Sequence, residues 1–306
     1  MSGLSGLPAL PSRRLGRTGH ESTVAILGAA CFARSTPEAT ASAFAAALER
    51  GVNHLDIAPR YGMAEDLVGP LLPAVRDRLF VGCKTTRRDP SGVRAQLEES
   101  LTKLGCAQFD LYQAHGVTSL DELSQRVDAF GEILRARDEG LCRFVGITGH
   151  DLGAPAAHAE AVRRWDLDTV MFPVNARLWA DPVYRRDAEA LLALCAERDV
   201  GVMAIKAAAA RPWGARAGSS GSSGERHTTT WYEPYTSVAD VERAVRFTLS
   251  VEGVDAFCTP SDIGVMTTAL DAAARFSSSG PLGPSEMAAL SAEVAGEQLI
   301  FPMPTA

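Results

Sequence analysis

The chain has 306 residues, of which 46% are hydrophobic and 22% are charged, and this composition excludes an intrinsically disordered protein. The formal net charge of -7 and the sequence pI near 5.5 argue against nucleic acid or an anionic membrane as partners, because both require a concentrated basic surface. Six scattered cysteines without a CxxC pair indicate reduced thiols, with neither disulfides nor a metal site.

The sequence also contains no recognisable membrane or export segment. No stretch approaches the roughly 18 consecutive apolar residues of a membrane-spanning helix. The opening residues, MSGLSGLPALPSRR, lack the long apolar centre and the positive amino-terminal cluster of a secretory signal. We therefore expect a cytoplasmic protein.

The first structural unit is a strand followed by a helix. We expect a flexible start over residues 1–12, then a hairpin around Gly19 and a strand at 24–28. A helix should follow, because Pro37 suits its first position and Gly51 ends it after an alanine-rich run.

The same strand and helix unit recurs seven more times along the chain. The predicted strand and helix pairs are 51–58 with 64–75, 79–84 with 91–104, 109–115 with 120–139, 142–150 with 154–164, 168–175 with 187–198, 200–206 with 238–249, and 253–260 with 263–276. Eight such units over roughly 250 residues favour a closed barrel over an open doubly wound sheet. We predict an α/β fold, a (β/α)8 TIM barrel with an N-terminal β-hairpin cap, as a single domain spanning 1–306.

One connection is unusually long. Residues 209–235, between the seventh and eighth units, contain a Gly/Ser tract and the aromatic residues Trp213, Trp231, Tyr232 and Tyr235. We interpret this insertion as a partly mobile lid over the barrel mouth; a solvated insertion without a functional role is the alternative. Residues 284–306 should form a C-terminal helix and tail.

Polar residues occur where several predicted strands end. Asp56 closes the second strand with Tyr61 on the loop beyond, Lys84 closes the third, His115 the fourth and Lys206 the seventh. Each has a structural explanation by itself, as a cap, a surface lysine or a core residue. Because the carboxyl ends of barrel strands open onto one mouth, we expect them to converge there, and the convergence favours a functional site.

The chemistry of this set is coherent. A tyrosine is too weak an acid to donate a proton at neutral pH unless a nearby cation stabilises its phenolate, which Lys84 can do while Asp56 holds the lysine in place. His115 can orient a carbonyl oxygen or relay a proton. The set contains neither a nucleophile nor a metal cage, so the reaction requires an external reagent.

Five ordered segments resemble the aldo-keto reductase family: RRLGRTG, DIAPRYGMAE, CKTT, DLYQAH and VGITGH, between about Arg13 and about Phe276. The resemblance implies a (β/α)8 barrel that binds NADP(H), less often NAD(H), without a Rossmann domain or metal. It also implies a catalytic tetrad in which a tyrosine is the general acid or base while hydride passes between the nicotinamide and a carbonyl carbon. The implied tetrad is Asp56, Tyr61, Lys84 and His115.

The resemblance is weaker for the cofactor-binding residues. Where the family commonly holds the nicotinamide amide with a Ser-Asn pair and a Gln, this chain has Thr148 with Gly149, and Met171. His150 and Asn175 are candidate substitutes on proximity in sequence.

Further cofactor contacts are expected at the ends of other strands. Lys206 would bind the pyrophosphate, and Ser261 and Asp262 would contact the adenosine end. Gly28 and Ala29, at the end of the first strand, are also expected to contact the cofactor. Asp262 would repel a 2′-phosphate if it points inward, and could instead bind a free ribose hydroxyl. We expect NADP(H) in preference to NAD(H), with NAD(H) left open.

The leading hypothesis is an NAD(P)(H)-dependent oxidoreductase acting on a small aldehyde, ketone or sugar-like alcohol. Two alternatives stay open: a redox-neutral epimerase, isomerase or lyase with tightly bound nicotinamide, and a non-catalytic regulatory subunit that binds the cofactor. The oligomeric state is left open. The predicted substrate pocket is rimmed by aromatic residues: Phe32, Trp179, Trp213 and Trp231.

Overall fold

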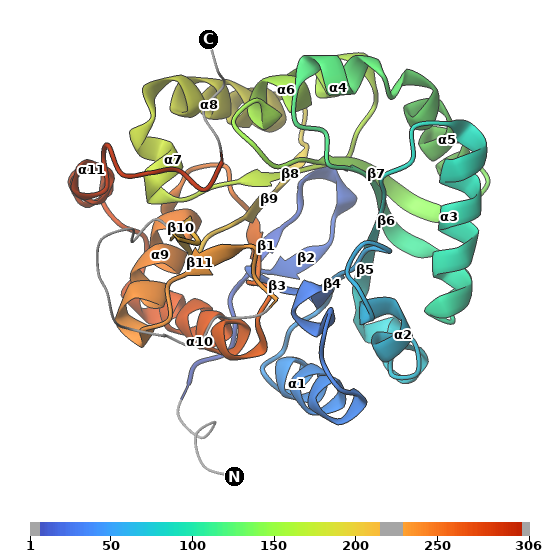
Figure 1. The fold of residues 1–306 in the computed structure, drawn as a ribbon, viewed down its shortest axis with the longest axis horizontal. Helices are drawn as coiled ribbons and strands as arrows, with labels where there is room; N and C mark the ends of the chain where they lie inside the picture. Colours follow the sequence, from blue (N-terminus) through green and yellow to red (C-terminus); the bar gives the residue numbers. More distant parts are fainter. Residues whose placement is uncertain (1–6, 215–228, 302–306) are drawn as a thin grey trace.

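The computed structural model describes residues 7–214 and 229–301 and contains a closed barrel of eight parallel strands, which confirms the predicted fold class. Figure 1 shows the helices surrounding the strands. In barrel order the strands are β12 (Ala256–Cys258), β3 (Ala25–Gly28), β4 (His54–Asp56), β5 (Phe80–Thr85), β6 (Phe109–His115), β7 (Cys142–Thr148), β8 (Thr169–Pro173) and β9 (Gly201–Ile205), and β9 pairs with β12 to close the ring.

The helices alternate with the strands along the chain. They are α1 (Pro37–Glu49), α2 (Ala64–Val68), α3 (Pro90–Lys103), α4 (Leu120–Ser124), α5 (Val127–Asp138), α6 (Ala154–Arg164), α7 (Ala176–Ala180), α8 (Pro182–Glu197), α9 (Val238–Ser250), α10 (Ile263–Ser279) and α11 (Pro284–Glu293). Among the described residues, none of these helices combines the length and apolarity needed to cross a membrane. α11 lies within the segment 284–306 expected to form the C-terminal helix and tail.

Side-chain caps explain where helices begin. Thr36 caps α1 by accepting a hydrogen bond of 3.2 Å from the backbone N–H of Ala39, and the predicted first helix is confirmed. Asp181 caps α8 in the same way, so this helix begins at Pro182, earlier than the predicted start at 187.

Two predicted helices are shorter than expected. The segment 64–75 forms α2 followed by a short 3-10 turn, and the segment 120–139 is divided into α4 and α5. α4 ends because the N–H of Arg126 bonds to the carbonyl of Leu123, three residues back, where a continuing α-helix would bond four residues back. Arg126 is thereby placed between two helices, where it is only 4% exposed.

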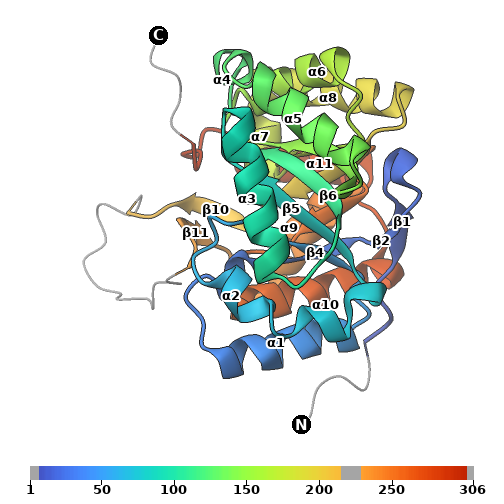
Figure 2. The same ribbon diagram turned by 90° about the vertical axis from the view of Figure 1, so that its right-hand side faces the viewer.

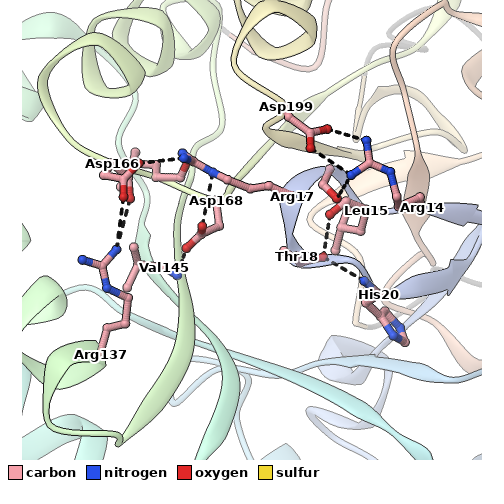
Figure 3. A network of polar contacts seen from close by, with 12 residues as sticks. Arg14, Leu15, Arg17, Thr18, His20, Arg137, Val145, Asp166, Asp168 and Asp199 are labelled. Carbon is pink, nitrogen blue, oxygen red and sulfur yellow. Dashed lines mark hydrogen bonds and ion pairs between the residues drawn. The ribbon is translucent and has the colours of Figure 1, made fainter.

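An N-terminal hairpin covers one end of the barrel. It consists of β1 (Ser12–Arg14), a 3-10 turn at 16–18 and β2 (Glu21–Thr23). Figure 3 shows how ion pairs fix it: Arg14 pairs with Asp199 at 2.6 Å, and Arg17 pairs with Asp166 at 2.7 Å. The chain just before the hairpin also packs on the barrel, since Leu10 is buried.

The hairpin also seals the barrel interior with an apolar side chain. Leu15 is fully buried at the turn of the hairpin. It belongs to an apolar cluster made with residues of the barrel strands: Ile26, Phe80, Leu111, Met171, Met203, Ile205 and Ala256. The interior at this end is therefore a packed core, and the site must lie at the other end.

The insertion after the seventh barrel strand lies at the opposite end from the hairpin, as Figure 2 shows. Its two ends pair as an antiparallel sheet of β10 (Ala209–Pro212) and β11 (Tyr232–Pro234). The Gly/Ser tract lies outside the described residues. The described ends of the insertion therefore stand beside the carboxyl ends of the barrel strands.

Leu15→Ala tests the seal. Because the surrounding strands cannot collapse into the vacated space, we expect the free energy of unfolding to fall by about 2–5 kcal/mol, measured by urea denaturation followed by circular dichroism. Val238→Ala is the control, since Val238 is 58% exposed, and it should change the free energy by less than about 0.5 kcal/mol. Equal losses from the two substitutions would contradict the proposed seal.

Candidate active site

Strand pairing brings Asp56 and Lys84 into the same space. Asp56 ends β4 and lies opposite Gly82 of the neighbouring strand β5. Lys84 is two residues beyond Gly82, so it is on the same face of β5. Both side chains are almost completely buried, each residue being 1% exposed.

The loop after β4 carries Tyr61 back over the barrel mouth. The N–H of Tyr61 donates to the carbonyl of Ala58 at 3.0 Å, which closes a tight turn. Gly62 follows with a φ of +52°, and a Cβ at that position would lie 2.3 Å from the carbonyl oxygen of Ala33. Only glycine fits there, which explains why the tyrosine is followed by one.

Lys84 joins these residues into one hydrogen-bonded group. Its Nζ donates to the Asp56 carboxylate at 2.5 Å and to the Tyr61 hydroxyl oxygen at 2.9 Å. The Tyr61 hydroxyl is itself 3.4 Å from Asp56 Oδ2. The tyrosine oxygen therefore accepts a hydrogen bond from a buried ammonium group that is held by a carboxylate.

Electrostatics assigns charge states to the pair of Lys84 and Tyr61. Burial lowers the pKa of Lys84, but Asp56 and Tyr61 more than offset this, so the pKa is raised and the ammonium is kept. Burial raises the pKa of Tyr61, and Lys84 opposes that rise only in part. Lys84 thus acts on Tyr61 in the expected direction, while burial determines that the phenol keeps its proton in the resting site.

His115 lies beside Tyr61. The two ring centroids are 6.0 Å apart and the rings are nearly perpendicular, at 85°. Burial, and then the neighbouring Lys84 cation, hold the pKa of His115 well below its usual value. Burial also lowers the pKa of His150, whose ring centroid is 5.7 Å from that of His115, to about 3. Both imidazoles are therefore neutral at physiological pH.

A cavity of about 560 Å³ opens above this group at the carboxyl ends of the strands. Among its described lining residues none is Asp or Glu, while Arg60, Arg126 and Lys206 are cationic. The described part of the chain also contains no group of three or more His, Cys, Asp or Glu residues arranged to hold a metal ion. We call this cavity the mouth pocket.

Several sequence-predicted residues line the mouth pocket, and Asp56 and Lys84 hold Tyr61 from below. The predicted residues in the lining are Tyr61, His115, Thr148, His150, Lys206, Trp231 and Ser261. The structure therefore brings the predicted tetrad and part of the predicted cofactor site together.

Other predicted residues do not line the mouth pocket. Ala29 and Phe32 are fully buried, and Trp179 lines a separate cavity beside α8 and α11. The indole nitrogen of Trp213 donates to the carbonyl of Thr230 at 2.9 Å, which links the two ends of the insertion. Of the four predicted pocket aromatics, Trp231 alone lines the pocket, because Phe32 and Trp179 pack in the core and Trp213 is hydrogen-bonded within the insertion.

Besides Ala29, four predicted cofactor residues lie outside the lining. Gly28 and Gly149 pack closely against neighbouring strand and loop atoms. Asn175 and Asp262 are helix caps, whose side-chain oxygens accept backbone hydrogen bonds at 3.0 and 3.1 Å. Direct contact between these four residues and a ligand is not needed to explain their presence.

Lys206 is held in an unusual backbone conformation. Its φ is +66°, a left-handed value that costs a non-glycine residue about 1–2 kcal/mol, and the Asn175 amide donates to its carbonyl at 3.1 Å. Its Nζ lies 4.9 Å from the Trp231 ring centroid and 5.1 Å from that of Tyr232. Burial, and to a lesser degree Lys84, lower the pKa of Lys206 to about 8.

Three lining residues that carry a charge or a thiol were not predicted from the sequence: Arg60, Arg126 and Cys258. Cys258 ends the last barrel strand, with its Sγ 3.6 Å from Asp56 Oδ2, so its position at a strand end was an available signal. Arg60 directly precedes Tyr61. Arg126 gave no signal, because a charged residue inside a predicted helix is expected to face solvent.

A model of the aldo/keto reductase family matches residues 25–234. The chain belongs to the aldo/keto reductase family. Among curated proteins, it is 28% identical over 207 residues to an uncharacterized oxidoreductase of Bacillus subtilis, covering 63% of each chain. It is 35% identical over 153 residues to an aldo-keto reductase of Mycobacterium tuberculosis, covering 48% of this chain and 52% of that protein.

Solved structures resemble the barrel over most of its length. An aldo-keto reductase from Bacillus halodurans in its holo form has a TM-score of 0.69 at 18% identity, covering 94% of this chain and 96% of that one. The apo form of the same reductase has a TM-score of 0.65 at 20% identity, with the same coverage. At these identities the likeness shows the shared fold.

The charge of Lys206 can be measured directly, because the chain contains only three lysines, Lys84, Lys103 and Lys206. In a 13C-lysine NMR titration we expect Lys206 to titrate near pH 8, since burial disfavours its ammonium form. Lys103, which is exposed and bonded to Glu99, should titrate above the ordinary lysine value. Lys206→Met assigns the signal, and titration of Lys206 near 10.5 would contradict the buried environment.

Proposed function

We propose that the protein is an NAD(P)(H)-dependent oxidoreductase that interconverts a small carbonyl compound and the corresponding alcohol. The observation that carries this proposal is the Lys84 ammonium, which donates both to Asp56 and to the oxygen of Tyr61 at the base of the mouth pocket. This arrangement serves a proton transfer to or from an oxygen atom in the pocket. The substrate is an aldehyde, a ketone or a sugar-like alcohol.

In the direction of reduction, Tyr61 delivers its hydroxyl proton to the carbonyl oxygen of the substrate. An alkoxide is far more basic than a phenolate, so a tyrosine with a raised pKa still protonates the oxygen as negative charge develops on it. The Lys84 ammonium stabilises the resulting phenolate, and Asp56 keeps Lys84 in place. Neutral His115 orients the carbonyl oxygen by a hydrogen bond.

The described lining of the mouth pocket fits a nicotinamide dinucleotide. Lys206 is a cation suited to the pyrophosphate, and Thr148, His150 and Ser261 supply polar groups in the same lining. When bound, the nicotinamide supplies or accepts the hydride at the substrate carbon. The lack of acidic side chains in the described lining supports NADP(H) over NAD(H), since it favours the more anionic cofactor.

We further propose a cytoplasmic location. All six cysteines are free, which suits a reducing compartment, and four of them are buried.

Tyr61→Phe tests the proton donor. We expect kcat for NADPH-dependent reduction of an aldehyde panel to fall by roughly 100-fold or more, because general acid catalysis contributes about that much. NADPH affinity, measured by fluorescence titration beside NADH, should stay nearly unchanged. Tyr235→Phe is the matched control, because Tyr235 is the last residue of the insertion and lies outside the described mouth-pocket lining, and it should keep wild-type turnover.

Two results would overturn the assignment. Undiminished turnover by Tyr61→Phe would exclude Tyr61 as the donor. Substrate conversion without any net change in NADPH would instead support a redox-neutral reaction with retained cofactor.

A further inference from the structure

The cationic residues of the mouth pocket lie on two opposite sides of the barrel. Lys206 follows β9, and Ser261 follows β12, which is paired with β9. Arg60 follows β4, and Arg126 lies beyond β6, on the other half of the ring β12-β3-β4-β5-β6-β7-β8-β9. The proposed cofactor side therefore accounts for Lys206 and leaves the two arginines without a role.

Arg126 is a buried cation whose hydrogen-bonding capacity is not fully used. It is 4% exposed, and its Nε donates to Glu122 Oε1 at 2.6 Å. Its Nη1 is buried and has no hydrogen-bond partner among residues 7–214 and 229–301. A buried donor without a partner costs about 1–3 kcal/mol, and more on a charged group, so a purely structural arginine would be expected to have its donors paired.

The carboxylate that contacts Arg126 is shared with a second guanidinium. Arg88 donates to the two oxygens of Glu122 at 3.2 and 2.5 Å. One negative charge thus stands between two positive ones, and the group keeps a net positive charge. Arg88 does not belong to the described lining, so the excess charge reaches the mouth pocket through Arg126.

The position of Arg126 relates this charge to the reacting end of the pocket. Arg126 is close enough to His115 to lower its pKa, together with larger effects of burial, Lys84 and His150. Arg60 adds a second guanidinium from the Tyr61 loop, is exposed, and forms no ion pair with any described carboxylate. An anion held here would lie beside Tyr61 and His115, on the side away from Lys206.

We propose that the carbonyl substrate carries an anionic group, a carboxylate or a phosphate, and that the buried guanidinium of Arg126 binds it. This inference rests on the proposed function and specifies its substrate class. Guanidinium groups pair with both anions through parallel N–H donors, so Arg126 is a specificity-determining residue and the reacting carbonyl remains with Tyr61.

Matched substrates test this assignment. The carboxylate pair is 4-carboxybenzaldehyde with 4-methylbenzaldehyde, and the phosphate pair is glyceraldehyde 3-phosphate with glyceraldehyde. We expect the wild-type kcat/KM to favour the anionic member of at least one pair by roughly 10- to 100-fold, the range of a charge-assisted hydrogen bond. The pair that shows the preference identifies the anion.

Arg126→Gln should remove that preference, mainly by raising KM for the anionic substrate. The neutral substrate and NADPH affinity should be nearly unaffected. Arg126→Lys keeps the charge and should restore part of the preference. Arg135→Gln is the matched control, since it breaks the ion pair of an exposed arginine with Glu132 and changes neither Glu122 nor a described lining residue, and it should leave the preference intact.

Other outcomes overturn the inference. Equal kcat/KM values within both pairs would exclude an anionic substrate while leaving the reductase function standing, and turnover of none of the four aldehydes would overturn both. A parallel loss of NADPH affinity in Arg126→Gln would assign Arg126 to the cofactor. If that variant fails to fold, competitive inhibition of wild type by benzoate, but not by benzamide, supports the proposal, and equal inhibition overturns it.

Discussion

The buried ion pair between Lys84 and Asp56 is the interaction on which the site depends. Charges in the protein interior are tolerated only when they are paired, and removing one partner of such a pair costs about 3–5 kcal/mol. The register of β4 and β5 forces these two side chains into one space, and the 2.5 Å contact pairs their opposite charges. The tight turn ending at Gly62 then leaves Tyr61 Oη within 2.9 Å of the ammonium group.

This pairing also determines the charge that the mouth pocket presents to a ligand. Lys84 is neutralised locally by Asp56, and the neighbouring imidazoles of His115 and His150 are uncharged. The positive charge available to ligands therefore comes from Lys206 on one side and from Arg60 and Arg126 on the other. Because Lys206 loses its proton as the pH rises through about 8, the two sides should respond differently to pH.

The sequence was sufficient to predict the barrel and to identify the polar residues at the ends of its strands. Strand periodicity and helix caps are local properties, and the rule that barrel strands open onto one mouth converts chain order into proximity. For this reason the sequence alone groups Asp56, Tyr61, Lys84 and His115.

Residues whose orientation depends on packing could not be assigned in this way. Arg126 is inside the pocket because α4 ends early, and an amphipathic pattern does not predict such a break. Trp179 and Phe32 were predicted to line the pocket, but both side chains are buried in the core. Asn175 affects the pocket indirectly, because it caps α7 and its amide donates to the backbone carbonyl of Lys206.

The most direct test of this account is the rate at which Lys84→Met transfers deuterium from 4-deuterated NADPH to the carbonyl carbon of an aldehyde. We expect wild type to place the label on the carbinol carbon of the alcohol. The Lys84→Met protein should bind the cofactor but transfer the label at roughly one hundredth of the wild-type rate or below, because its tyrosine has lost the cation that stabilises the phenolate. Transfer by Lys84→Met at the wild-type rate would contradict the account.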